Sequence, residues 1–276
     1  MSQLVVQGLV PGVDEALTLD RLAGDWKIFQ LASGHRFSVD DQLVAWMASR
    51  VGHEATRLLD LGAGLGSVGL ITLWALGSDP QRAAALRLTM VEAQEHSHRL
   101  ALATLAHNGL QDRVVALFGD MRATTLGLTP PYDLVTGSPP YFPLGTGKVS
   151  PHPQKAACRM ELRGTIADYA RTAAAVMDDS SWFVACFPAR DPRGEAAFPA
   201  AGLCVRASCD VVFREGMDPM IRLFAAQRRA GPRVVWPSLT IRAKDGSWTE
   251  TYTAVRKELG VISPGEAQQA MSGAPK

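Results

Sequence analysis

The sequence has few cysteines, little net charge and no long apolar run, and each shortage narrows what the chain can be. Its 276 residues include only four cysteines, and no two of them form a Cys-x-x-Cys pair. We therefore expect reduced thiols, as in cytoplasmic proteins, with neither a disulfide framework nor a zinc or other metal site. No apolar stretch approaches the roughly 18 residues of a membrane span, and no secretory signal opens the chain, so no membrane partner is expected.

The charges are almost balanced. There are 28 Lys and Arg residues against 27 Asp and Glu residues, a formal net charge of +1. Such a chain has no overall field that attracts a polyanion, so any nucleic-acid site must be a local basic patch. Apolar residues make up 47% of the sequence, which is enough for one large α/β domain.

Strands and helices alternate through the middle of the chain. The apolar runs "RLLDL", "LRLTMVE", "RVVALF" and "YDLV" are separated by helical segments, a pattern typical of a parallel sheet covered on both faces. Residues 17–30 indicate a β-hairpin, and Ser38 with Asp41 resembles a capping box that opens a helix. The final third has two long strands, at 203–213 and 221–229, and an Asp-Gly hairpin signal at 245–246, which together predict an antiparallel edge.

These patterns predict a single domain over residues 17–261. It consists of the hairpin and helix (17–50) followed by a core (51–261). The segments before and after it, 1–16 and 262–276, show no firm periodicity and are expected to be flexible.

A glycine-rich loop, "DLGAGLG", follows the first strand of the core. Gly62, Gly64 and Gly66 let the backbone turn tightly and approach a ligand without Cβ collisions. Acidic residues also stand at three successive strand ends, and the carboxyl ends of parallel strands meet at one edge of the sheet. We therefore expect three carboxylates around one ligand, those of Asp60, Glu92 and Asp120.

The same loop leaves a second cofactor class open. Read from Gly64, the letters spell G-x-G-x-x-G, and Glu92 stands 28 residues further on, where an NAD-binding protein has a ribose-binding acid. Asp60 directly before the loop suits a cationic or ammonium-bearing ligand better than a pyrophosphate. An NAD-dependent dehydrogenase stays an alternative.

A serine, two prolines and an aromatic residue follow the fourth strand, in "TGSPPYFP". One interpretation is that Pro139 and Pro140, which cannot donate to a sheet ladder, simply end the strand. The other is that they stiffen a short backbone arc whose carbonyls and preceding side chain point at a ligand. The stretch by itself is compatible with both.

Together, the motifs resemble those of class I S-adenosylmethionine-dependent methyltransferases. The resemblance implies a Rossmann-like α/β fold with a mostly parallel seven-stranded sheet, an antiparallel C-terminal edge and a short N-terminal hairpin and helix. It also implies S-adenosylmethionine as cofactor and S-adenosylhomocysteine as product. Glu92 would then bind the ribose and Asp120 the adenine, with Asp60 and the loop glycines at the amino acid end.

The arc from Ser138 to Tyr141 resembles the Asn-Pro-Pro-Tyr or Asp-Pro-Pro-Tyr motif of amino-group methyltransferases. By that resemblance, Ser138 Oγ and the Pro139 carbonyl accept the hydrogens of an exocyclic amine, Pro140 stiffens the arc, and Tyr141 stacks on the base. Such an amine is a poor nucleophile, so the rate gain comes from positioning and hydrogen bonding. The serine departs from this motif, and Ser-Pro-Pro-Tyr also resembles the motif of DNA cytosine-N4 methyltransferases. A cytosine amine and a protein glutamine amide therefore remain alternative targets.

Longer stretches are similar to bacterial tRNA1(Val) adenine-N6 methyltransferases over roughly residues 16–260. They include "GHRFSVDD" before the glycine loop, "CRMELRGTIADY" after the arc and "PSLTIRAKDGSWTETY" near the end. The resemblance implies methylation of adenine N6 in tRNA, and it places Arg36, Phe37 and Asp40 against the cofactor. An alternative of another class is a cofactor- and RNA-binding protein that has lost turnover with the serine.

Two basic stretches could form the local patch that tRNA requires. Residues 143–164 make a long linker, and long linkers in compact domains are often functional. The second stretch is "QRRAGPR" at 227–233. The residues expected to contact RNA phosphates are Lys148, Lys155, Arg159, Arg163, Arg228 and Arg229.

Overall fold

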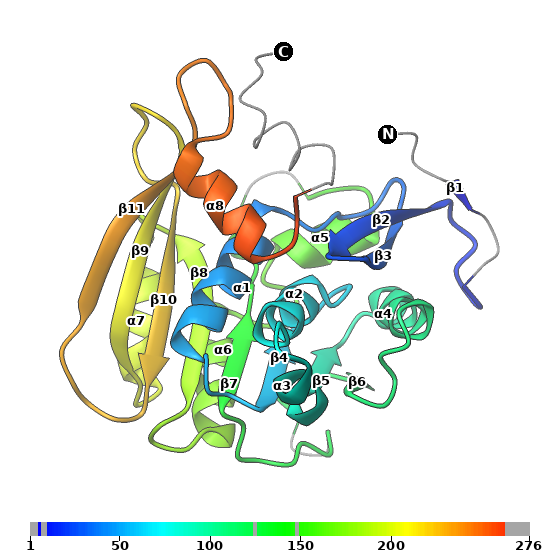
Figure 1. Ribbon diagram of the computed structural model, residues 1–276, viewed down its shortest axis with the longest axis horizontal. Helices are drawn as coiled ribbons and strands as arrows, with labels where there is room; N and C mark the ends of the chain where they lie inside the picture. The colour runs from blue at the N-terminus through cyan, green and yellow to red at the C-terminus, as the bar shows by residue number, and fades with distance from the viewer. Residues whose placement is uncertain (1–4, 7–9, 124–125, 147–148, 263–276) are drawn as a thin grey trace.

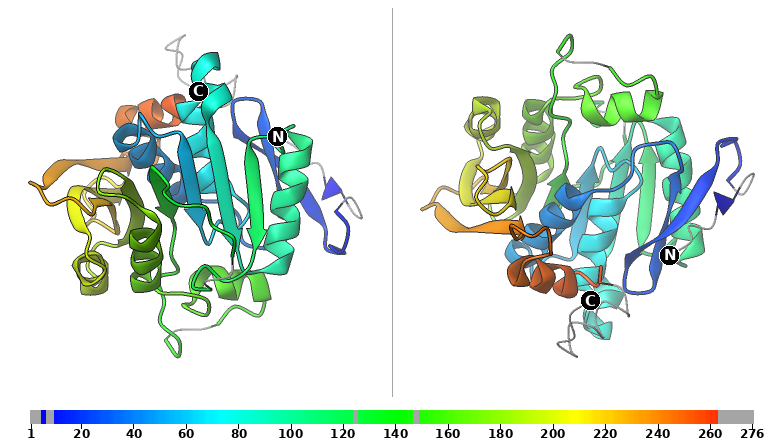
Figure 2. Two further views of the ribbon diagram at one scale, coloured as in Figure 1. Left: turned by 90° about the horizontal axis from the view of Figure 1, so that it is seen from below. Right: turned by 90° about the horizontal axis from the view of Figure 1, so that it is seen from above.

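A computed structural model describes residues 5–6, 10–123, 126–146 and 149–262. At its centre is a mixed, mostly parallel sheet with helices on both faces (Figures 1 and 2). Its strands are β4 (Arg57–Leu61), β5 (Arg87–Glu92), β6 (Val114–Phe118), β7 (Leu134–Gly137), β8 (Trp182–Pro188), β9 (Cys204–Arg214), β10 (Ile221–Gln227) and β11 (Val234–Arg242). The order β11-β9-β10-β8-β7-β4-β5-β6, with β4 to β8 parallel, confirms the predicted Rossmann-like fold.

The C-terminal edge is antiparallel, as predicted, but its last strand differs. β10 runs antiparallel to both β8 and β9, whereas β11 pairs parallel with β9 and adds an eighth strand. The turn predicted at 245–246 forms and joins two antiparallel arms, with the Ala243 N–H donating to the Ser247 carbonyl at 3.0 Å. Its second arm is short: one bridge joins Arg242 to Trp248, and the chain then enters α8 (Glu250–Glu258). Thr249 caps this helix by accepting the Tyr252 N–H at 3.1 Å, and the Tyr252 ring is buried, so capping and burial favour helix over strand here.

The N-terminal hairpin forms as predicted, from β2 (Leu17–Ala23) and β3 (Trp26–Leu31). A short strand, β1 (Val5–Val6), pairs with β2 to make a separate sheet. Val10 and Val13 are buried, so part of the segment 1–16 that was expected to be flexible packs on the domain instead. The tail beyond residue 262 lies outside the described residues.

Helices cover the two faces of the main sheet with two hydrophobic clusters. One cluster lies beneath α1 (Val39–Val51), α2 (Ser67–Leu76) and α4 (Glu95–His107), and the other beneath α6 (Ile166–Val176) and α7 (Pro192–Ala200). Side chains of β8 alternate between them, so this strand is buried on both faces. Two short helices complete the fold: α3 (Pro80–Ala85) and α5 (Pro153–Arg159).

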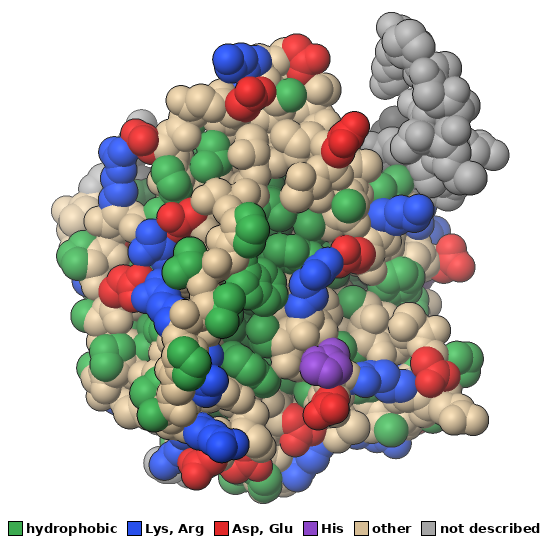
Figure 3. All heavy atoms as spheres, turned by 60° about the vertical axis from the view of Figure 1, so that its left-hand side comes forward, with side chains coloured by type: hydrophobic (Ala, Val, Ile, Leu, Met, Phe, Trp, Pro, Cys, Tyr) green, Lys and Arg blue, Asp and Glu red, His purple; other side chains and the backbone are tan. Residues whose placement is uncertain are grey.

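The side of the molecule nearest the C-terminal strands has a mixed surface. Figure 3 shows hydrophobic, basic and acidic side chains interspersed there, with no broad area of one sign. Val234 and Val235 of β11 are among the exposed apolar side chains. No helix in the described part of the chain is long and apolar enough to cross a membrane.

Candidate active site

A cavity of about 410 Å³ opens at the carboxyl ends of the parallel strands, within the size range of ligand pockets. Its walls come from the glycine loop after β4, the end of β5, the arc after β7, the segment before α1, and α5. Because β4, β5 and β7 run parallel, their loops meet at this one edge. The predicted residues on the wall are Phe37, Asp40, Asp60, Gly62, Gly64, Glu92, Ser138, Pro139, Pro140, Tyr141, Arg159 and Arg163.

Three residues predicted to bind the cofactor are not on the wall, Arg36, Gly66 and Asp120, and an ion pair holds two of them. The Asp120 carboxylate is held by Arg122, whose Nε lies 2.9 and 3.1 Å from its two oxygens, and this pair is partly exposed to solvent. Arg36 donates to Asp20 of β2 at 2.7 Å, which directs its guanidinium away from the cavity. In both cases a nearby partner of opposite charge holds the side chain. Gly119 and Met121, on either side of Asp120, do line the cavity, and the roles of Arg36 and Asp120 toward the cofactor stay predictions.

The six predicted RNA contacts do not gather at one place. β10 is antiparallel to β8, so it ends at the amino-terminal edge of the parallel strands, opposite the cavity (Figure 1). Arg228 and Arg229 follow β10, and Arg228 donates to the Ala174 carbonyl at 2.7 Å. These two arginines are therefore separated from the cavity mouth. Lys155 lies on α5 near the mouth, whereas Lys148 lies outside the described residues.

The glycine loop and the end of β5 form the first side of the cavity. Gly64 has a φ of +57°, and a Cβ added to it would meet no atom within 4 Å, so the backbone here faces open space. The Gly64 N–H donates to Glu92 Oε2 at 2.7 Å, and the Gln94 N–H donates to Oε1 at 2.5 Å. Gly66, with a φ of +91°, instead forms the N-cap of α2 and is not on the wall.

Asp60 supports this side rather than presenting free oxygens. It is only 1% exposed, its Oδ2 accepts the Gly69 N–H at 2.9 Å, and its Oδ1 accepts the Thr136 hydroxyl at 2.8 Å. The carboxyl group thus connects β4 to α2 and β7. Burial raises its pKa to about 7, although the two hydrogen bonds oppose that rise.

Ser138 and Asp41 both line the second side of the cavity. Ser138 follows β7, and its Oγ lies 3.7 Å from the sulfur of Cys186. Asp41, in the first turn of α1, accepts the Ser38 N–H and the Ser67 hydroxyl at 3.0 Å, both at Oδ2. Burial raises the pKa of Asp41, and hydrogen bonds from Ser38, Ser67 and Ser138 oppose that rise. The sequence pattern predicts Asp41 only as part of a helix cap.

Tyr141 is anchored on the same side by its hydroxyl group. It donates to Asp40 Oδ2 at 2.7 Å and lies 3.1 Å from the sulfur of Cys186. Its ring meets the Phe187 ring edge-on, with centroids 5.7 Å apart. Burial raises the pKa values of Tyr141 and Asp40, so the hydroxyl stays protonated at neutral pH. The ring is held as part of the cavity wall.

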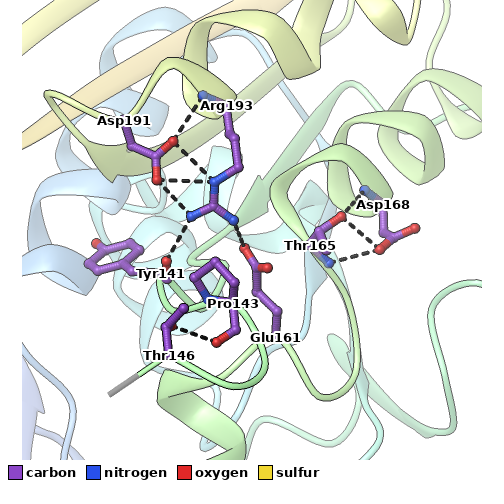
Figure 4. A network of polar contacts seen from close by, with 8 residues as sticks. All are labelled: Tyr141, Pro143, Thr146, Glu161, Thr165, Asp168, Asp191 and Arg193. Atoms are coloured by element: carbon purple, nitrogen blue, oxygen red, sulfur yellow. Dashed lines mark hydrogen bonds and ion pairs between the residues drawn. The ribbon is translucent and has the colours of Figure 1, made fainter.

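Arg193 of α7 fixes the backbone of the arc from behind (Figure 4). Its guanidinium donates to the Tyr141 carbonyl at 3.0 Å and is held in turn by Glu161 at 2.5 Å and Asp191 at 2.6 Å. No sequence pattern identifies Arg193 as part of the site. The "DPRGE" stretch does signal a helix start, with Asp191 as N-cap and Pro192 at the first position, but no local pattern indicates a contact across 52 residues.

The chain is similar to known methyltransferases in sequence and in fold. No family model matches the chain. A tRNA1(Val) (adenine(37)-N6)-methyltransferase from Citrobacter koseri is 26% identical over 203 residues, which cover 72% of this chain and 78% of that protein. Among solved structures, a predicted O-methyltransferase from Agrobacterium tumefaciens aligns with a TM-score of 0.57 at 20% identity, covering 80% of this chain and 97% of the other.

Proposed function

We propose that this chain, which has the class I S-adenosylmethionine-dependent methyltransferase fold, methylates N6 of an adenine in tRNA. The observation that carries the proposal is that the Ser-Pro-Pro-Tyr arc faces the glycine loop and Glu92 across one cavity. A target amine held by the arc would therefore lie next to a cofactor held by the loop. The similarity to the Citrobacter koseri protein supports tRNA as the substrate and adenine N6 as the acceptor.

The first side of the cavity fits S-adenosylmethionine. A carboxylate has about four lone-pair positions, and two N–H groups occupy two of those of Glu92. Glu92 thus keeps acceptors for two ribose hydroxyls, while the open backbone at Gly64 leaves room for the amino acid part. When bound, the cofactor supplies an electrophilic methyl group on a sulfonium.

The second side fits an exocyclic amine. Ser138 can direct its proton to Asp41, which leaves lone pairs on Oγ to accept one hydrogen of the amine, and the Pro139 carbonyl accepts the other. The nitrogen lone pair would then point at the methyl group that the cofactor supplies. The proton that the amine loses on accepting the methyl group would pass to water at the cavity mouth. Fixed acceptors of this kind stabilise the charge that develops on nitrogen.

The same arc would also serve a cytosine amine or a glutamine amide, so the class of acceptor needs a direct test. The protein is incubated with methyl-labelled S-adenosylmethionine and, separately, with RNA, DNA and protein extracts from cells that lack the activity. We expect label in RNA of tRNA size. Label in DNA or protein alone would overturn the tRNA proposal, and cofactor binding without any transfer would indicate a binding protein instead.

A further inference from the structure

A half-exposed aromatic side chain stands at the mouth of the cavity. Phe142 directly follows the arc, lines the cavity and is 50% exposed. Two hydrogen bonds fix its backbone: its N–H donates to the Arg159 carbonyl at 3.1 Å, and its carbonyl accepts the Glu161 N–H at 2.9 Å. The ring is therefore presented to solvent by a backbone that is already ordered, which lowers the entropy cost of a contact with a ligand.

Two leucines close to these paired segments in the chain are also exposed. Leu144 is 62% exposed and Leu162 is 47% exposed. Leu144 follows Phe142 by two residues, and Leu162 comes directly after Glu161, the hydrogen-bond partner of the Phe142 carbonyl. We call Phe142, Leu144 and Leu162 the apolar shelf. Such a group beside a cavity indicates a contact surface for something larger than the cavity's own ligand.

Two cations without partners border the shelf. No described residue forms a hydrogen bond or ion pair with the guanidinium of Arg159 or the ammonium of Lys155, which lie four residues apart on α5. Burial lowers the pKa of His35 on the cavity wall, and the charges of Arg159 and Lys155 add to this lowering. Arg163 differs, because it donates to the Ala93 carbonyl at 2.6 Å beside the end of β5.

An aromatic ring next to unpaired cations matches the chemistry of a nucleic acid strand whose bases are not paired. Bases of single-stranded RNA stack on aromatic side chains, whereas those of a duplex are not available for stacking. The cations complement the phosphates of the same strand.

We propose that Phe142, Arg159 and Lys155 form a docking surface for the single-stranded RNA that flanks the target adenine. Phe142 stacks on a neighbouring base, and the two cations contact backbone phosphates. This proposal rests on the proposed function, because it assumes that the substrate is RNA.

The test compares Phe142→Ala, Phe142→Trp and Arg159→Ala with two controls distant from the cavity. Val235→Ala removes an exposed apolar side chain of β11, and Arg229→Ala removes a cation at the opposite sheet edge. Binding of unmodified tRNA and of an adenine-containing single-stranded oligonucleotide is measured by fluorescence anisotropy over a range of KCl concentrations. Methyl transfer to the same RNAs is measured in parallel.

Phe142→Ala should weaken binding of both RNAs by about 5- to 100-fold without changing the salt dependence, and Phe142→Trp should retain affinity. Arg159→Ala should lower the slope of log affinity against log salt by about 0.7. Both controls should behave like the parent. If the parent transfers methyl groups to RNA but Phe142→Ala binds as tightly as the parent, the docking surface is wrong and the proposed function stands. If the parent methylates only protein or DNA, both proposals fail together.

Discussion

The two sides of the cavity are built from different kinds of contact. On the cofactor side, Glu92 and Asp60 accept backbone N–H groups that are 28 and 9 residues away in the chain, and Asp60 accepts one side-chain hydroxyl, that of Thr136. On the target side, the Tyr141 hydroxyl contacts side chains of Asp40 and Cys186, which are 101 and 45 residues away. Backbone donors remain when side chains change, whereas side-chain partners change with each substitution. The cofactor side is therefore fixed by the fold, and the target side can be altered by mutation.

The largest effect should come from the target side, at Ser138. If its Oγ accepts a hydrogen of the amine mainly in the transition state, Ser138→Ala should lower turnover by about 10- to 1,000-fold. Cofactor affinity should stay the same, because Glu92 and the glycine loop are untouched. Single-turnover kinetics and calorimetry on the same preparation measure the two quantities. An unchanged turnover would mean that the Pro139 carbonyl and the anchored Tyr141 ring are sufficient.

The cofactor side should respond in the opposite way. Glu92→Ala should weaken S-adenosylmethionine binding by about 1.5 to 3 kcal/mol, or roughly 10- to 150-fold, because it removes the acceptors of the ribose hydroxyls. Glu92→Gln keeps the size and one acceptor oxygen, so it is the matched control and should lose less. Calorimetry with S-adenosylmethionine and with NAD tests both cofactor classes. Tight NAD binding together with no S-adenosylmethionine binding would favour the dehydrogenase alternative.

The difference between the cofactor side and the target side also explains which site residues the sequence could predict and which it could not. Asp60, Gly64 and Glu92 lie on short segments with strong local patterns, and all three line the predicted cavity. The expected role of Asp120 depended only on its place after a strand, and nothing in that place indicates that Arg122 would hold its carboxylate.

On the target side, local patterns identified Ser138 and Tyr141 but not their partners. Asp41 was predicted correctly as a cap, yet its position opposite Ser138 depends on how α1 packs against the sheet. The helix α5 was predicted as part of a linker, although Pro153 at its first position is a helix-start signal. Contacts between distant segments follow from the assembled fold, so single-sequence patterns do not contain them.

A smaller effect should separate the two roles of Asp41. Asp41→Asn keeps an oxygen for the helix cap but replaces a carboxylate acceptor of the Ser138 proton, so turnover should fall by about tenfold. With Ser138→Asn in place, which changes the arc to Asn-Pro-Pro-Tyr, the same change should cost much less. Turnover and helix content of the two single variants and the double variant form the test. An equal loss in both backgrounds would mean that Asp41 acts only as a cap.

The smallest effect on activity is expected at Asp60. Its contribution is measured instead as the pH dependence of folding stability. Its pKa of about 7 lies above the ordinary value of 3.8. Between about pH 4 and pH 7 the folded protein therefore holds a proton that the unfolded chain has released, and folding stability falls as pH rises through this window. The slope from one such group is at most about 1.4 kcal/mol per pH unit.

Asp60→Asn should remove this part of the pH dependence, since an amide can accept from Gly69 N–H and donate to Thr136. Urea unfolding of the variant and the parent at pH 5 and pH 8 measures it. Asp120→Asn is the control of opposite sign, because hydrogen bonds from Arg122 lower the pKa of Asp120 and make its ionised form stabilising. Identical pH curves for the parent and Asp60→Asn would contradict an uncharged Asp60 in the folded protein at pH 5.

The proposed function depends most on which atom receives the methyl group. tRNA from cells that lack the activity is incubated with S-adenosylmethionine and either the parent or Ser138→Ala, digested to nucleosides and analysed by mass spectrometry. The account predicts N6-methyladenosine with the parent and much less with Ser138→Ala, although both proteins bind the cofactor equally. Methylated cytidine in place of N6-methyladenosine, or the same yield from both proteins, would contradict it.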